Sequence, residues 1–150
     1  MFVNEMSEKE SRDLLGRSSM GRLGCSKDDQ PYVIPIYFAF EGDYFYVLST
    51  LGQKIEWMRA NPKVCIEIDE VASESEWASV VVNGQYQELP EPRFADERAH
   101  ARKLLEKRYR WWQNALGERQ LKSGTELIEP TFFRIHVTSM SGLRSKGEGK

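Results

Sequence analysis

The sequence predicts a mainly β protein, an antiparallel barrel of about six strands with flanking helices. Short apolar runs recur along the chain between turn residues, and few segments carry helical signals. The chain has 150 residues, of which 40% are hydrophobic and 29% charged. Such a composition is typical of one globular domain, residues 1–150, that can bury a sizeable core.

The first elements are a short helix, a strand and a turn. Ser7-Glu8-Lys9-Glu10 fits a capping box, in which the Ser7 hydroxyl caps the Glu10 N–H and the Glu10 side chain reaches back. We therefore expect a helix to about Gly16. Met20 to Cys25 alternates weakly and indicates a strand, and the polar residues Lys27 to Gln30 indicate a turn.

The segment from Tyr32 to Phe40 is apolar on both faces, which predicts a strand covered on both sides. Pro35 lies in its middle, and a proline lacks the N–H that a strand donates, so it marks an edge, a bulge or an opening. Glu41-Gly42-Asp43 predicts a turn, with Tyr44 to Ser49 as the hairpin partner.

The rest of the chain completes the sheet and adds two helices. Gly84 indicates a bulge or bend within its strand, and the residues after Thr138 end in a polar tail, Ser145–Lys150, that we expect to fray. The expected strands are Val64–Asp69, Trp77–Leu89 and Thr131–Thr138, the expected helices are Leu51–Ala60 and Phe94–Leu116, and Glu70–Glu76 is expected as an acidic loop.

Composition and charge argue against several functions. The formal net charge of −2 gives no general attraction to nucleic acid or to an anionic membrane. No stretch approaches the roughly 20 apolar residues of a membrane span, and the first residues do not resemble a secretory signal. We expect a cytoplasmic protein, with Cys25 and Cys65 as buried free thiols.

Common catalytic and metal motifs are missing from the sequence. His100 and His136 are far apart and have no second ligand at metal-binding spacing, so no metal site is expected. There is no dinucleotide fingerprint, no P-loop and no nucleophile elbow. The catalytic residues stay unknown, with His136 and Tyr37 as the only candidates.

A possible phosphate site lies where the second helix begins, at Ser49-Thr50-Leu51-Gly52-Gln53-Lys54. A helix N-terminus carries partial positive charge and unpaired N–H groups, so it binds anions. Lys54 opposes the helix dipole there, and a bound anion would remove that conflict. The alternative is structural: Thr50 to Gln53 also fits a capping box that only starts the helix.

Taken in order, several short motifs resemble the FMN-binding split barrels related to pyridoxamine 5′-phosphate oxidase, in the branch that includes flavin-nucleotide-binding and nitroimidazole-resistance proteins. The resemblance covers nearly the whole chain. Its markers are Gly21–Gly24, Tyr32–Phe38, Gly52–Lys54, Asn61–Val64, Trp77–Gly84, Phe133–Ile135 and Ser141-Gly142.

The resemblance implies a six-stranded antiparallel split β-barrel that forms a homodimer, with FMN bound at the subunit interface. It places the isoalloxazine ring beside the strand Val33, Ile34, Pro35 and Ile36. It assigns the phosphate to Ser49, Thr50, Gln53 and Lys54, and further flavin contacts to Trp77 and Ser79. Gln53 stands where true oxidases often carry arginine.

Two departures bear on the activity. The substrate-binding segment of genuine pyridoxamine 5′-phosphate oxidases is not recognisable in Phe132 to Lys150, and the histidine of many nitroimidazole-resistance proteins is missing from Tyr46 to Ser49. The resemblance therefore implies an FMN-dependent oxidoreductase acting on another small molecule. The alternatives are a flavin-binding or flavin-trafficking protein without turnover, and a deazaflavin- or haem-binding relative on the same barrel.

Overall fold

The computed structural model describes residues 2–49, 52–108 and 131–147. Within these ranges the elements are β1 (Phe2–Glu5), α1 (Glu8–Arg17), β2 (Met20–Lys27), β3 (Gln30–Tyr37), β4 (Ala39–Glu41), β5 (Tyr44–Ser49), α2 (Gln53–Ala60), β6 (Lys63–Ser73), β7 (Glu76–Glu88), α3 (Ala95–Arg108) and β8 (Thr131–Lys146).

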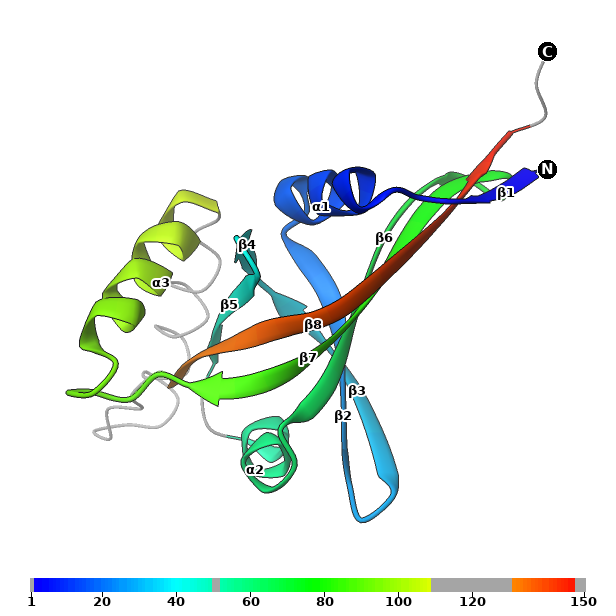
Figure 1. Cartoon of the computed structure of the whole chain (residues 1–150). Helices are drawn as coiled ribbons and strands as arrows, with labels where there is room; N and C mark the ends of the chain where they lie inside the picture. Colours follow the sequence, from blue (N-terminus) through cyan, green and yellow to red (C-terminus); the bar gives the residue numbers. More distant parts are fainter. Residues whose placement is uncertain (1, 50–51, 109–130, 148–150) are drawn as a thin grey trace, which may run out of the picture.

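The strands form one antiparallel sheet with the order β3-β2-β6-β7-β8-β5-β4, and β1 pairs with the far end of β8. The sheet curls so that β3 comes to lie against β5, although no ladder joins these two strands within the described ranges (Figure 1). The mainly β, antiparallel split-barrel fold with flanking helices is thus confirmed. To the six strands expected from the sequence, the structure adds the short strand β1, and it divides one expected strand to give β4.

Three long strands continue beyond the barrel as a projecting arm. β6, β7 and β8 have 11, 13 and 16 residues and run side by side toward the two termini, where β1 joins them (Figure 1). We use the name arm for residues 2–5, 69–79 and 141–146. The sequence of the arm is polar and therefore gives no clear strand signal. The predicted loop Glu70–Glu76 is wrong, because β6 continues to Ser73. The predicted fraying at Ser145 is also wrong, since Ser145 is buried in β8.

Local sequence signals explain most element boundaries. The predicted capping box at α1 is confirmed: the Glu10 N–H donates to Ser7 Oγ and the Ser7 N–H donates to Glu10 Oε1, both at 3.1 Å. The predicted turn before β3 is also confirmed, with Asp28 and Asp29 at φ values of 50° and 63°. The expected strand from Tyr32 to Phe40 divides at Phe38 into β3 and β4.

Two apolar clusters hold the fold together. The main core fills the barrel, with α1 and α2 closing it through the fully buried side chains Leu14, Leu15, Ile55 and Met58. A second cluster lies beneath α3, which packs Ala101 and Leu105 against β4, β5 and β8. The expected C-terminal part of this helix, up to Leu116, lies outside the described residues.

Two further expectations concern single residues and the membrane. Cys25 is buried, as predicted, but Cys65 is exposed, because it lies on the outer face of β6 while Val64 and Ile66 face the core. Among the described helices, none is long and apolar enough to cross a membrane.

Candidate functional site

The N-terminus of α2 is the place of the predicted phosphate site. The helix directly follows β5, and its N-cap is Gly52, which provides no side-chain hydrogen bond to the first turn. Gln53 is exposed and Lys54 half-buried in that turn, and Ser49 ends β5. Thr50, the fourth predicted phosphate ligand and the predicted cap, lies outside the described residues. The helix therefore offers backbone N–H groups and a lysine to an anion.

The opposite end of α2 is firmly anchored to the sheet. Arg59 forms a bidentate pair with Glu88 at the end of β7, with N–O distances of 2.7 and 3.0 Å, and the Tyr86 hydroxyl donates to Glu88 at 2.6 Å. The hydrogen bonds from Arg59 hold the pKa of Glu88 below its ordinary range, and burial raises the pKa of Tyr86. The carboxylate is thus charged, and the phenol neutral, at neutral pH.

The four predicted flavin contacts on β3 divide between the two faces of the strand. Ile36 is buried in the core and Ile34 packs against it, whereas Val33 is 64% exposed and Pro35 faces the same outer side. β3 ends the strand order, so its far side has no ladder partner among the described strands. Pro35 lies on an edge strand, as its missing N–H predicts.

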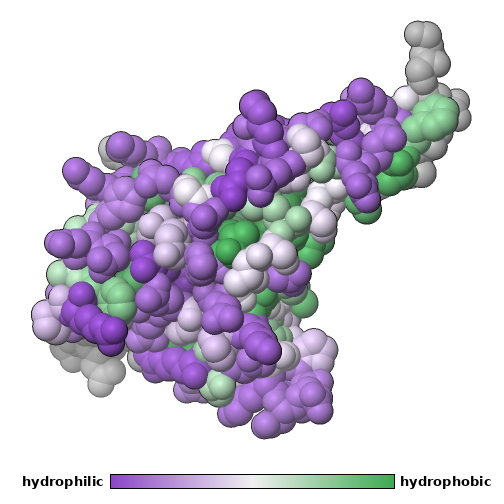
Figure 2. Space-filling view, in the orientation of Figure 1, coloured by the Kyte–Doolittle hydropathy of each residue, from purple (hydrophilic) through white to green (hydrophobic). Residues whose placement is uncertain are grey.

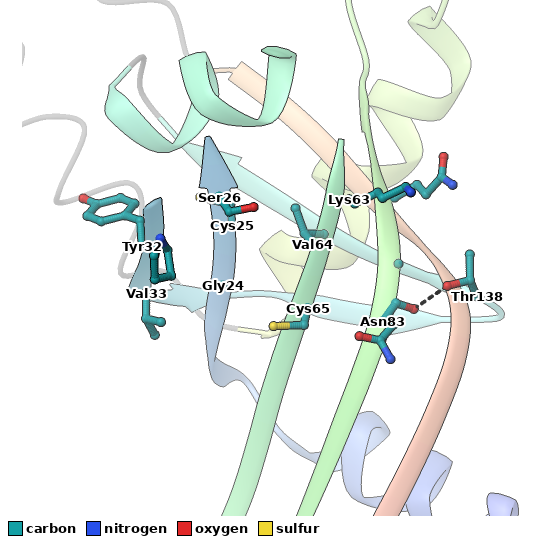
Figure 3. A pocket seen from close by; sticks show the side chains of 13 residues that line it. Gly24, Cys25, Ser26, Tyr32, Val33, Lys63, Val64, Cys65, Asn83 and Thr138 are labelled. Carbon is teal, nitrogen blue, oxygen red and sulfur yellow. Dashed lines mark hydrogen bonds between the residues drawn. The ribbon is translucent and has the colours of Figure 1, made fainter. Parts of the chain in front are cut away.

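A cavity of about 520 Å³ lies on the outer face of the sheet beside Val33 (Figure 3). β2, β3, β6, β7 and β8 all contribute to its lining, which includes Cys65, Asn83 and Thr138. Its volume is within the range of small-molecule sites. The sequence reasoning missed it, because it is created by the register of separate strands and not by any motif.

The last two predicted contacts, Trp77 and Ser79, lie on the arm. Ser79 Oγ donates to Glu67 at 2.8 Å, and Arg22 lies 3.6 Å from the same carboxylate. Burial raises the pKa of Glu67, and a hydrogen bond with Asp69 raises it further. Ser79 therefore already has a partner within the chain.

The structure does not bring the arm residues to the α2 end of the sheet. β7 runs from Trp77 on the arm to Glu88, the partner of Arg59, and eleven steps of an extended strand span roughly 35 Å. Trp77 therefore lies far along β7 from the end of the strand that Arg59 of α2 contacts. The candidate His136 also lies elsewhere, on β8, with its ring 5.1 Å from that of Tyr44.

Apolar side chains are exposed on the outer face of the sheet. Figure 2 shows them along the arm and on the side of the sheet that is turned away from α3. The exposed apolar side chains there belong to separate strands of one sheet and are Val33, Val71, Val81 and Leu143. They lie on one face of the sheet, which Arg22 and Glu67 share, and we call these four apolar side chains the outer apolar face.

Among the described residues there is no group of three or more His, Cys, Asp or Glu side chains that could hold a metal ion.

Comparison with known proteins gives consistent results. A family model described as pyridoxamine 5′-phosphate oxidase matches residues 7–144. An uncharacterised protein of Rhizobium meliloti is 49% identical over 114 residues, which cover 75% of this chain and 76% of that protein.

Solved structures with the same fold include a FAD-binding protein of Mesorhizobium loti, with a TM-score of 0.79, 38% identity and coverage of 97% of this chain and 98% of that one. A FAD-binding protein of Mycobacterium smegmatis has a TM-score of 0.66 at 20% identity, covering 97% and 99% of the two chains. A haem-binding protein of the same organism has a TM-score of 0.67 at 16% identity, covering 93% of this chain and 54% of that one, so it shows the fold alone. The match to the family model and the identity to these relatives show that the chain belongs to the pyridoxamine 5′-phosphate oxidase family.

Proposed function

We propose that this protein binds a flavin nucleotide, FMN, with the phosphate at the N-terminus of α2. The observation that carries the proposal is the arrangement of this terminus: Gly52 gives it no side-chain cap, Lys54 lies in the first turn, and Arg59 anchors the other end. The residues present fit the group, since a phosphate accepts hydrogen bonds from free N–H groups and pairs with a lysine.

The strand β3 would hold the isoalloxazine ring. Pro35 leaves a gap in the donor pattern of an edge strand, and Ile34 and Val33 provide apolar surface on its two faces. An aromatic ring buried against such a strand would contribute most of the binding free energy, while the phosphate would fix the orientation. The FAD-binding relative from Mesorhizobium loti, at 38% identity, supports a flavin as the ligand.

We propose further that the active form is a homodimer. Trp77 lies on the arm, which projects away from the barrel, so it would contribute to the flavin site of a second copy. The outer apolar face provides the hydrophobic surface that such an association needs. Each site is incomplete in one chain and complete in two.

The activity that this arrangement supports best is that of an FMN-dependent oxidoreductase acting on a small molecule. The flavin would supply the redox chemistry, and the protein would supply binding, orientation and exclusion of water. The alternative is a flavin-binding or flavin-trafficking protein. The 2.8 Å bond from Ser79 to Glu67 favours it, because this polar group already has a partner within the chain.

The visible absorption spectrum of the purified protein tests the proposal, together with mass spectrometry of any chromophore released on denaturation. We expect FMN at one per chain, either as purified or after addition of FMN. A colourless protein that binds neither FMN nor FAD would contradict flavin binding. For a flavin-loaded protein, oxidation of NADPH in the presence of an acceptor separates an oxidoreductase from a protein that only binds the cofactor.

A further inference from the structure

Arg22 of β2 lies beside the strand that is proposed to hold the flavin ring. It is the register partner of Pro35 on β3, and both side chains belong to the outer face of the sheet, because the next pair, Leu23 and Ile34, is turned to the core. Side chains that face each other across two antiparallel strands have Cβ atoms about 5 Å apart. A ring that lies against Pro35 is therefore within reach of the Arg22 side chain.

The guanidinium group of Arg22 is only partly engaged within the chain. One nitrogen, Nη1, lies 3.6 Å from Glu67 and 3.5 Å from Asp69, and its other nitrogens have no partner among the described residues. Arg17, by contrast, forms a bidentate pair with Glu70 at 2.8 and 2.9 Å. An arginine carries several N–H donors in a planar fork, so Arg22 keeps donors for a planar group on the outer face.

The two carboxyl groups beside Arg22 oppose its charge only in part. Burial raises the pKa of Glu67, and a hydrogen bond with Asp69 raises it further. The Ser79 hydroxyl donates to Glu67 at 2.8 Å and holds this carboxyl group in place. A raised pKa lessens the negative charge at Glu67, so the two groups screen Arg22 less than two fully ionised carboxylates would.

The flavin ring has a different charge in its two redox states. Reduction adds two electrons and one proton to the neutral ring, and one negative charge then lies on the nitrogen and carbonyl oxygen of its pyrimidine half. A cation within hydrogen-bonding reach stabilises the charged form more than the neutral form, because a charge-assisted hydrogen bond is the stronger one. An arginine beside the ring therefore separates the affinities for oxidised and reduced flavin.

We propose that Arg22 is a flavin-binding residue that donates to the pyrimidine half of the ring and selects the reduced, negatively charged form of FMN. This role rests on the proposed function, since it needs a ring beside Pro35. The phosphate contacts at α2 cannot make the same selection, because the phosphate carries the same charge in both redox states. Glu67 and Asp69 limit the preference by their opposite charge.

The midpoint potential of bound FMN tests this role, because it measures the ratio of the affinities for reduced and oxidised cofactor. Dithionite titration of the FMN-loaded protein with a reference dye gives the potential, and fluorescence titration gives the affinity for oxidised FMN. Arg22→Gln should lower the reduced-to-oxidised affinity ratio at least ten-fold, which corresponds to a fall of about 30 mV in a two-electron potential. Arg22→Lys keeps the charge and should lower the ratio less.

Two further variants test the charge balance without changing Arg22. Asp69→Asn removes a negative charge beside the guanidinium group and should raise the ratio several-fold. Arg17→Gln is the matched control: its side chain is 53% exposed against 51% for Arg22, and it pairs with Glu70 of the same strand, β6. Glu70 lies on the opposite face of the sheet from Asp69, so Arg17→Gln should leave the ratio unchanged.

Three results would overturn the role of Arg22 and leave the proposed function intact. One is an FMN-loaded Arg22→Gln variant with the potential of the natural chain. A second is an equal fall in Arg22→Gln and Arg17→Gln, because the effect would then be one of overall charge. The third is a fall with Asp69→Asn. A natural chain that binds FMN in neither redox state would instead overturn the proposed function, and the role of Arg22 with it.

Discussion

At the scale of single residues, Lys54 is the side chain on which the proposed phosphate site most depends. It lies in the first turn of α2, where a positive charge opposes the helix dipole unless an anion is bound. Its contribution should therefore appear in ligand affinity.

Replacement of Lys54 by alanine should weaken FMN binding by about 1.5–3 kcal/mol, the usual loss for a hydrogen bond to a charged group. Fluorescence titration of the apoprotein with FMN measures this change. Lys9→Ala on α1 is the control, since Lys9 pairs only with Asp13 on the surface. An unchanged FMN affinity for Lys54→Ala would rule out the phosphate assignment.

Gly84 shows how a single residue adapts the sheet. It lies at the register shift between β7 and β8, and a Cβ there would come within 2.6 Å of the His136 carbonyl oxygen and of the Ile135 side chain. The bulge that the sequence predicts at this position is confirmed.

Gly84→Ala should therefore destabilise the fold by about 1–3 kcal/mol, the typical cost of overpacking. Urea unfolding measures the change. Gly16→Ala is the matched control: nothing lies within 4 Å of its Cβ position in α1, so alanine there should increase stability by about 0.5–1 kcal/mol. Equal effects of the two substitutions would show that the close approach at Gly84 is relieved at no cost.

At the scale of elements, α2 is fixed to the sheet at its C-terminal end and has no side-chain cap from Gly52 at its N-terminal end. Arg59, Glu88 and Tyr86 fix its C-terminal turn on β7, and the Asn61 amide donates to Ser26 of β2 at 3.2 Å. These contacts fix the direction of the helix axis. They therefore also fix the direction of the backbone N–H groups in the first turn of α2.

Arg59→Gln should lower both FMN affinity and stability, the latter by about 1 kcal/mol because the pair is half-exposed. Arg12→Gln is the control, since Arg12 anchors α1 to Asp43 at 2.7 Å in a similar way and should lower stability only. If both variants keep full FMN affinity, the anchor does not orient the phosphate site.

The same pair gives a pH dependence with a definite sign. The pKa of Glu88 lies below its unfolded value, so its contribution to stability is present above that value and is lost as the pH falls through the folded pKa. The difference in unfolding free energy between the natural chain and Glu88→Gln should be full at neutral pH and shrink in acid. A difference that grows on acidification would contradict this assignment.

The elements differ in how far the sequence predicts them. The helix from Ser7, the turn at Asp28 and the hairpin at Gly42 carry their own local signals and agree with the structure. The arm does not, because its strands are polar and exposed and are specified by pairing between β6, β7 and β8 over long sequence separations. Thr50, at the centre of the predicted phosphate site, lies outside the described residues.

The candidate site divides in the same way. The sequence indicates Gln53 and Lys54 by their place at the start of a helix. It indicates Pro35 because proline has no backbone N–H to donate within a strand. Cys65 and Asn83, which line the cavity beside Val33, have no local signal, since they become neighbours only through the register of β6 and β7. Register is set by the whole sheet and not by adjacent residues.

At the scale of the whole molecule, the outer apolar face and the arm favour association of two copies. Val81 lies in the middle of that face, on β7, and is 41% exposed. A long charged side chain there would be desolvated in a dimer but would remain in water in a monomer.

Val81→Arg should therefore give a monomer that also loses FMN, because each proposed site needs the arm of the second copy. Light scattering coupled to size-exclusion chromatography measures the mass, and absorbance measures the flavin content. Lys103→Glu on the exposed side of α3 should change neither. A Val81→Arg monomer that still binds FMN at full affinity would show that one chain makes the whole site.

The position of β8 in the sheet has a consequence for synthesis. β8 is the last of the described strands along the chain, yet among these strands it alone links β7 and β5 in the strand order. A growing chain on the ribosome can pair β2, β3, β6 and β7, and separately β4 and β5, but the two groups have no common ladder until residue 131 and its successors emerge. Until then both β5 and β7 expose an unpaired edge, so this is the stage at which the nascent protein is most open to aggregation and to chaperones.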